Sequence, residues 1–179
     1  MISHSHRRFV MFLSLTIVVA GAAILLRRHF SEYPEGRVEL ACHEIKSGVN
    51  IGENIGFLSQ WQTRADASFR VHLMALAFSA FVQNPDAFLP ILAHGTDHEK
   101  EFVLAVVREG LSYYLDWFGG IDGVTRARVE DLSRSFDERA RGISGIPASL
   151  GNEFRRSVVE ELKTIDASNG ESPMGRKSH

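Results

Sequence analysis

Two glutamates beside a glycine-rich stretch are the first residues to consider for catalysis. Glu44 and Glu53 accompany residues 48–56, which contain three glycines. Paired carboxylates at a cleft are the equipment of a glycoside hydrolase, in which one acts as general acid and the other as base or nucleophile. No acid in the sequence stands in the apolar context that general-acid catalysis requires. A hydrolase of the cell envelope or its peptidoglycan, using Glu44 or Glu53, is therefore an alternative and not the first prediction.

Histidines suggest metal binding as a second kind of chemistry. His94 and His98 are four residues apart, a spacing at which two histidines of one helix can share a zinc ion. The residues between them include a glycine, and residues 96–99 have the sequence of a helix capping box. We therefore expect the two histidines on different helices, and no metal ligand is predicted. A metal- or ligand-responsive sensor that also involves His72 is a further alternative.

Nucleophilic catalysis has little support in the sequence. Cys42 is the single cysteine and is followed by His43, but successive residues of a helix point about 100° apart, so His43 is poorly placed to act as its base. Cys42 is expected to be a small buried residue on an apolar helix face. Ser79 lies two helical turns from His72, and no nucleophile-elbow motif accompanies it. We predict no catalytic residue and no cofactor.

A dense group of aromatic residues is the best candidate for a binding surface. Tyr113, Tyr114, Trp117 and Phe118 fall within six residues, so they cannot all face one core. Exposed aromatic side chains are enriched at partner surfaces and at membrane interfaces. We predict these four residues as a partner-binding site. The alternative places Tyr114, Trp117 and Phe118 in the core and leaves Tyr113 half exposed.

Composition and charge narrow the class of protein. The chain has 179 residues, of which 44% are hydrophobic and 23% charged, which is typical of a globular protein. Residues 1–30 contain four arginines and no acid, whereas residues 31–179 contain 16 Lys and Arg against 22 Asp and Glu. An acidic body offers no continuous positive surface for phosphates, so we predict no binding to nucleic acid.

The N-terminal segment predicts membrane association. Residues 9–26 carry no charge, and arginine pairs lie on both sides of them. Eighteen apolar residues are close to the roughly 20 that span a bilayer. The apolar run continues to Leu26, beyond the small residues at which a signal peptidase would cut. We therefore predict a single-pass transmembrane anchor. Cleavage near Ala22, which would release a secreted or periplasmic protein, is the alternative.

The side of the membrane on which the body lies is less well determined by the sequence. More lysines and arginines follow the apolar segment than precede it, which favours a cytoplasmic body. In contrast, a short tail containing Arg7 and Arg8 resembles the start of an export signal, which favours an exported body. We predict an inner (cytoplasmic) membrane protein with its body on the exported side.

The elements that must position these residues are expected to be helices. From residue 31 onward the apolar residues recur at steps of three and four and almost nowhere alternate. The two most apolar helices are expected at the centre, and the last two are expected as an antiparallel hairpin laid on them. The predicted helices cover residues 36–47, 51–61, 64–83, a short or kinked stretch from 85 to 94 with Pro90 inside it, 97–118, 129–143 and 150–165.

The sequence thus predicts an all-α protein in three parts. Residues 1–30 form the signal-anchor, residues 31–166 a compact bundle of five to six helices, and residues 167–179 a disordered tail. The predicted function is that of a membrane-anchored, non-enzymatic helical binding module of the cell envelope, of the inhibitor, immunity or assembly-factor type. Its expected partners are the membrane, through residues 9–26, and another envelope protein.

Overall fold

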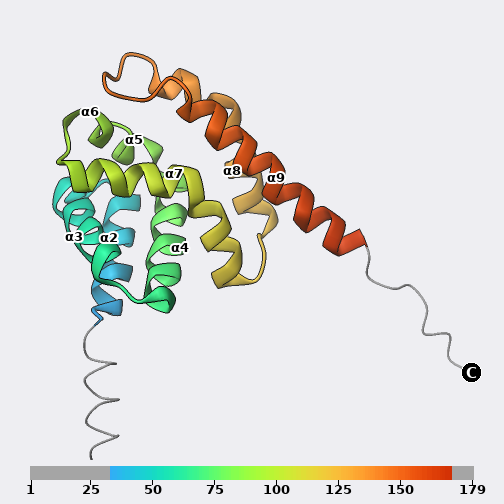
Figure 1. Cartoon of the computed structure of the whole chain (residues 1–179), viewed down its shortest axis with the longest axis horizontal. Helices are drawn as coiled ribbons and strands as arrows, with labels where there is room; N and C mark the ends of the chain where they lie inside the picture. Colours follow the sequence, from blue (N-terminus) through green and yellow to red (C-terminus); the bar gives the residue numbers. More distant parts are fainter. Residues whose placement is uncertain (1–32, 171–179) are drawn as a thin grey trace, which may run out of the picture. The chain divides into compact units, whose positions relative to one another are not determined.

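The computed structural model describes residues 33–170. The predicted membrane anchor, residues 9–26, and the last nine residues lie outside the described residues. The chain divides into two units, Met1–Glu35 and Gly36–His179, and the fold described here is that of the second unit. Its helices in chain order are α2 (Glu35–Lys46), α3 (Ile51–Arg64), α4 (Ala67–Gln83), α5 (Pro85–Phe88), α6 (Ile91–His94), α7 (Asp97–Phe118), α8 (Gly123–Ala140) and α9 (Leu150–Gly170) (Figure 1).

The predicted all-α bundle is confirmed for the described part of the chain. All regular secondary structure within residues 33–170 is helical. Helices α2, α3, α4, α7, α8 and α9 are each at least 12 residues long, and α5 and α6 are single turns of 4 residues. None of the helices between residues 33 and 170 combines the length and the apolar character that crossing a bilayer requires.

Helices α4 and α7 form the centre of the bundle. Asp66 caps the start of α4 by accepting a hydrogen bond from the backbone N–H of Phe69 at 2.8 Å, and most side chains of α4 are buried. Helices α2 and α3 lie on one side of this central pair, and α8 and α9 lie on the other (Figure 1). The largest fully buried aromatic side chains are Phe78, Phe81, Phe88, Phe102, Phe136 and Phe154.

Local capping residues determine where α7 begins and ends. The hydroxyl of Thr96 accepts a hydrogen bond from the backbone N–H of Glu99, and the carboxylate of Glu99 accepts one from the backbone N–H of Thr96 at 2.7 Å. This is the predicted capping box. The helix ends at Gly119, whose φ of 68° is left-handed and favours glycine. The predicted bounds, 97–118, are therefore confirmed.

Proline produces the break between α4 and α7. Pro85 occupies the first turn of α5, where its missing N–H costs no hydrogen bond. Pro90 follows α5 and precedes α6, so the stretch predicted as short or kinked is divided into two separate turns.

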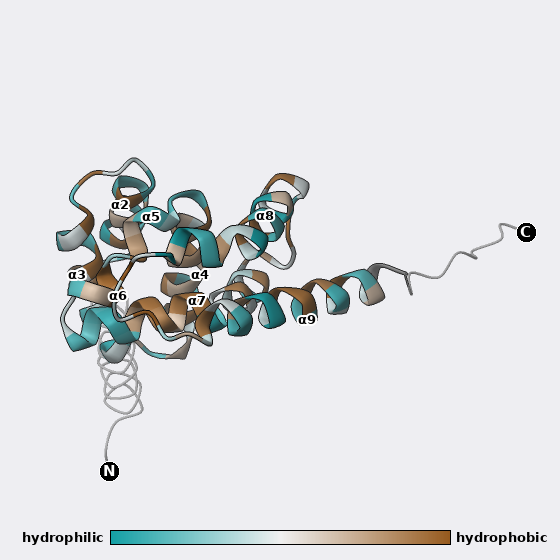
Figure 2. Cartoon of the chain, turned by 90° about the horizontal axis from the view of Figure 1, so that it is seen from above, coloured by the Kyte–Doolittle hydropathy of each residue, from teal (hydrophilic) through white to brown (hydrophobic). Residues whose placement is uncertain are grey.

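Helices α8 and α9 form the predicted antiparallel hairpin (Figure 1). The Phe154 ring of α9 lies 5.4 Å from Phe136 of α8 and 5.8 Å from Phe81 of α4, measured between ring centroids. Apolar residues recur between polar ones along α9 in Figure 2, as expected for a helix with one buried face.

The bounds of these two helices differ from the predicted ones. Helix α8 ends at Ala140, and Ile143 lies in the following loop, where it lines a cavity of about 200 Å³ with Phe136 and Ile146. Helix α9 continues to Gly170, four residues beyond the predicted end of the globular domain. Apolar periodicity stops at Ile165, but residues 167–169 contain no helix breaker, so the helix continues, with Ala167 and Ser168 exposed.

Candidate functional site

The four residues predicted to bind a partner lie in the last two turns of α7, and we call them the aromatic end. Tyr114 is buried, with 8% of its surface exposed, and Tyr113 is half-buried. Trp117 and Phe118 are 44% and 50% exposed. The alternative prediction is therefore right for the two tyrosines, but it is wrong for Trp117 and Phe118, which are not buried in the core.

Both exposed rings are supported by buried rings. Trp117 stacks on His72 of α4, with ring centroids 4.4 Å apart and planes inclined by 17°. Phe118 lies 4.6 Å from Tyr114, which in turn lies 6.0 Å from Phe78 in the core. Rings held in this way lose little conformational freedom when a partner covers them, which is a property of energetically important interface residues.

A row of aromatic rings continues from the aromatic end onto α3. Phe69 meets His72 edge-on, with centroids 6.4 Å apart, and Trp61 lies 6.1 Å from Phe69. Phe57 extends the row from Trp61 at 6.5 Å. The sequence by itself did not predict this row. The sequence does place Phe57 and Trp61 four residues apart, on one face of a helix. Their contact with Phe69 of α4, however, depends on how the helices pack.

One exposed apolar residue and two exposed acids lie close to the aromatic end in the chain. Val124, at the start of α8, is 66% exposed. Asp116 and Asp122 are exposed and are the charged residues nearest in the chain on either side of Trp117 and Phe118. The backbone N–H and the hydroxyl of Thr125 donate hydrogen bonds to Asp122 at 2.8 Å and lower its pKa.

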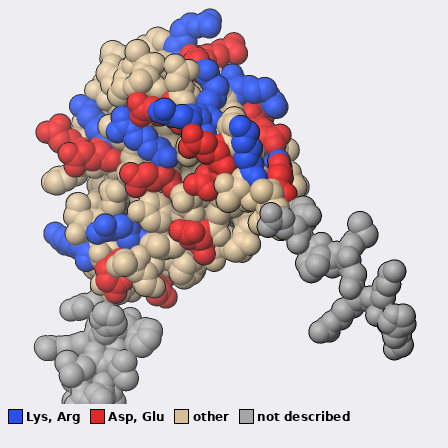
Figure 3. All heavy atoms as spheres, turned by 45° about the vertical axis from the view of Figure 1, so that its right-hand side comes forward, with Lys and Arg blue, Asp and Glu red and all other residues tan. Residues whose placement is uncertain are grey.

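Charge is distributed unevenly over the molecule. In Figure 3, acidic and basic side chains are interspersed mainly across the middle of the face shown, and uncharged areas lie in both its upper and its lower part.

Glu44 takes part in a hydrogen-bonded contact between two helices. Its Oε2 accepts a hydrogen bond from Nδ2 of Asn54 at 2.8 Å and lies 3.9 Å from Nη1 of Arg37. Asn54 is fully buried, and its Oδ1 accepts a hydrogen bond from Nη2 of Arg37 at 2.8 Å. These contacts link α2 to α3. Glu53 is exposed in the first turn of α3.

The predicted position of the two histidines is confirmed. His94 ends α6 and His98 lies in the first turn of α7, and both are exposed. Within residues 33–170, no three His, Cys, Asp or Glu side chains are close enough together to hold a metal ion. His72, the third histidine considered, forms the stack beneath Trp117.

Cys42 lies in the core, as predicted. Only 2% of its surface is exposed, and it shares the buried face of α2 with Val38 and Ile45. Burial raises the pKa of its thiol to about 12. Because the thiolate is the reactive form, this position is unsuited to nucleophilic catalysis.

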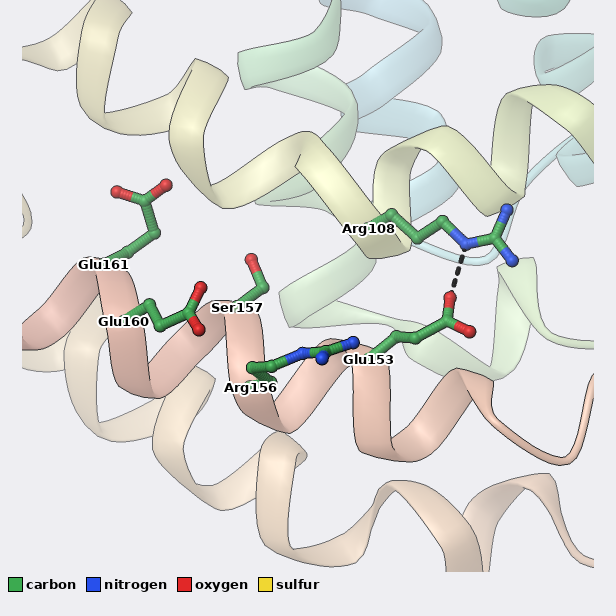
Figure 4. Close-up of a pocket in the computed structure, with 6 residues that line it drawn as sticks. All are labelled: Arg108, Glu153, Arg156, Ser157, Glu160 and Glu161. Atoms are coloured by element: carbon green, nitrogen blue, oxygen red, sulfur yellow. Dashed lines mark hydrogen bonds and ion pairs between the residues drawn. The ribbon is translucent and has the colours of Figure 1, made fainter.

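A polar groove of about 350 Å³ separates α7 from α9 (Figure 4). Arg108 reaches from α7 to Glu153 on α9, with 2.6 Å between Nε and Oε2. Hydrogen bonds from Ser149 and Arg108 lower the pKa of Glu153. Charges of both signs line the groove, and the ion pair of Arg108 with Glu153 joins the two helices. The lining residues are Arg108, Glu153, Arg156, Ser157, Glu160 and Glu161.

Known proteins provide no relative for comparison. No protein-family model matches this chain, and neither does any curated protein or any solved structure.

Proposed function

We propose that this protein is a membrane-anchored, non-enzymatic helical binding module of the cell envelope that contacts another envelope protein through the aromatic end of α7. Inhibitors, immunity proteins and assembly factors act in this way. Residues 9–26 support the anchoring, because they form an uncharged apolar run of nearly the length that spans a bilayer.

The exposure of two adjacent aromatic side chains carries the proposal. Trp117 and Phe118 are each about half exposed while they rest on buried rings. Tryptophan and other large anchor residues dominate the binding energy of protein interfaces when they are held in place before binding. A helix end that only faces solvent could carry polar or charged residues at both positions. The aromatic side chains therefore favour a contact with a partner.

The two alternative functions have less support. A hydrolase would need a carboxylate in the apolar setting that general-acid catalysis requires, whereas Glu44 is engaged by Asn54 and Arg37, and Glu53 is exposed. A metal sensor would need converging ligands, whereas His94 and His98 are exposed on separate helices. No feature of the described residues favours either alternative over the binding module.

Crosslinking in native membranes, followed by mass spectrometry, tests the proposal. The full-length wild type is expected to form crosslinks to another envelope protein. Phe118→Ser is expected to weaken this association by about 30-fold, because loss of an interface anchor costs roughly 2 kcal/mol. Val159→Ser is the matched control, since Val159 is similarly exposed, at 48%, and belongs to a different helix, α9. Crosslinks between copies of this chain alone, or equal losses in both variants, would contradict the proposal.

A further inference from the structure

His72 is a buried histidine whose ring contacts two other aromatic rings. It lies on α4 with 8% of its surface exposed, and its ring stacks on Trp117 of α7, with centroids 4.4 Å apart and planes inclined by 17°. Phe69 meets the His72 ring at an interplanar angle of 84°. The His72 ring is therefore the support on which the more exposed Trp117 rests.

The two nitrogens of the His72 ring have no protein partner but are open to water. Within residues 33–170, no hydrogen bond or ion pair joins His72 to another residue. In the same part of the chain, the one side-chain polar atom that is both fully buried and unpaired is Nη1 of Arg37, so neither nitrogen of His72 is sealed from solvent. The ring can thus gain a proton without opening of the core, and histidine ordinarily does so between about pH 5 and 8.

Charged side chains of the surrounding helices do not pair with the His72 ring. On α4, Asp66 and Arg70 are six and two positions from His72, and at about 100° per residue both point away from it. Ionisable side chains also occur on the nearby turns of the two other helices that contribute to the row of rings. These are Arg64 of α3 and Tyr113 and Asp116 of α7, and none of them forms a hydrogen bond or ion pair with His72.

The indole of Trp117 favours the charged form of the His72 ring. The face of an indole carries partial negative charge and attracts a cation that lies within about 6 Å of its centre, and the stacked ring of His72 is inside that range. Burial has the opposite effect, because desolvation disfavours charge. Access of the ring nitrogens to water reduces this cost of burial.

We infer that proton uptake by His72 converts its stack on Trp117 into a cation–π contact that holds Trp117 more firmly, so that pH regulates the aromatic end. The stack is a property of the protein without a partner. Its consequence for binding rests on the proposed function, under which association through Trp117 tightens as the pH falls.

Fluorescence of Trp117 in the full-length protein tests this inference. The chain has two tryptophans, so Trp61→Phe leaves Trp117 as the single one and keeps a ring beside Phe69. We expect the emission of Trp117 to fall as the pH is lowered from about 8 to about 5, because a protonated imidazole in contact with an indole quenches its fluorescence. Time-resolved anisotropy is expected to show less local motion of Trp117 at the lower pH.

Histidine variants in the same single-tryptophan protein are the controls. His72→Phe keeps a ring beneath Trp117 but cannot gain a proton, and we expect it to lose both responses to pH. His72→Gln also lacks an ionisable ring and makes the same comparison if His72→Phe fails to fold. His98→Gln changes an exposed histidine in the first turn of α7 and is expected to keep both responses.

The remaining outcomes would overturn the inference. Emission and local motion that do not change with pH would do so, and so would responses that persist in both His72 variants. A brighter and more mobile Trp117 at the lower pH would show that the charged ring leaves the stack for water. None of these results bears on the crosslinking described above, and loss of the crosslinks would overturn the proposed function without changing the response of the stack.

Discussion

Gly110 determines how closely the two central helices approach each other. A Cβ atom at this position would lie 2.7 Å from Cδ2 and 2.9 Å from Cβ of Phe78, which is fully buried on α4. Neither contact is tolerated without movement, and the Cβ of Phe78 cannot move without its backbone. One missing methyl group on α7 therefore permits the packing that forms the centre of the bundle.

We expect Gly110→Ala to destabilise the protein by about 1–3 kcal/mol, the usual cost of overpacking a core. Gly52→Ala is the matched control, because no atom lies within 4 Å of a Cβ built at that helical position. It is expected to stabilise the fold by up to about 1 kcal/mol through helix propensity alone. Thermal unfolding of the full-length variants, followed by circular dichroism in detergent, measures both. Equal midpoints for the two variants would show that α4 and α7 approach less closely than described.

At the scale of the elements, ion pairs hold the end of α9 against α8. Arg126 donates two hydrogen bonds to Asp166, at 2.7 and 2.9 Å, and Arg155 pairs with Asp137 nearer the start of α9. From residue 163 to residue 168 the side chains of α9 are only partly buried or exposed, so apolar packing contributes less there. The Arg126–Asp166 pair is consequently the main described contact of this last stretch.

The pair predicts how the end of α9 responds to acid. Hydrogen bonds from Arg126 lower the pKa of Asp166 below its ordinary value of 3.8. The stability that ionised Asp166 gives to the end of α9 is thus fully present above its ordinary pKa. This stability is lost as the pH falls through the lowered pKa of the folded state. We expect Asp166→Asn to speed amide hydrogen exchange after Leu162 at neutral pH, and to remove the acceleration that the wild type shows as it is acidified, after correction for intrinsic exchange.

The matched control is Asp131→Asn, since Asp131 pairs with Arg134 within α8 at 3.5 Å and holds no second helix. Exchange in α9 is expected to match the wild type in this variant. If Asp166→Asn also left exchange in α9 unchanged, the end of the helix would be held by contacts other than the ion pair.

At the scale of the whole molecule, the proposed anchor and its orientation decide which partners the helical domain can meet. The short tail with Arg7 and Arg8 favours retention of the N-terminus in the cytoplasm. We therefore expect a C-terminal tag to be digested by protease in intact spheroplasts, with the undigested membrane-bound species at the mass of the full chain. A cytoplasmic protein fused to the same tag serves as the control for lysis. A tag protected until lysis would place the body in the cytoplasm, and a shortened species would indicate cleavage near Ala22.

The sequence by itself determined the helices, because the signals that begin and end a helix act over a few residues. The Thr96 capping box, Pro90 and Gly119 mark the bounds around α6 and α7 where the structure has them. Apolar spacing likewise placed Cys42 on a buried face. The end of α9 was missed because residues 166–168 are exposed and leave no apolar pattern.

Only the tertiary structure decided which aromatic residues of α7 are available to a partner. Tyr114 turns toward Phe78, whereas Trp117 stays exposed on His72, 45 positions earlier in the chain. Similarly, the hydrogen bond from Asn54 to Glu44 joins two helices, and neither residue's local sequence indicates it. These outcomes depend on how helices cross, and crossing is determined by close contacts such as that of Gly110 with Phe78. Residues so far apart in the chain meet only when the core packs, so no local pattern records their contact.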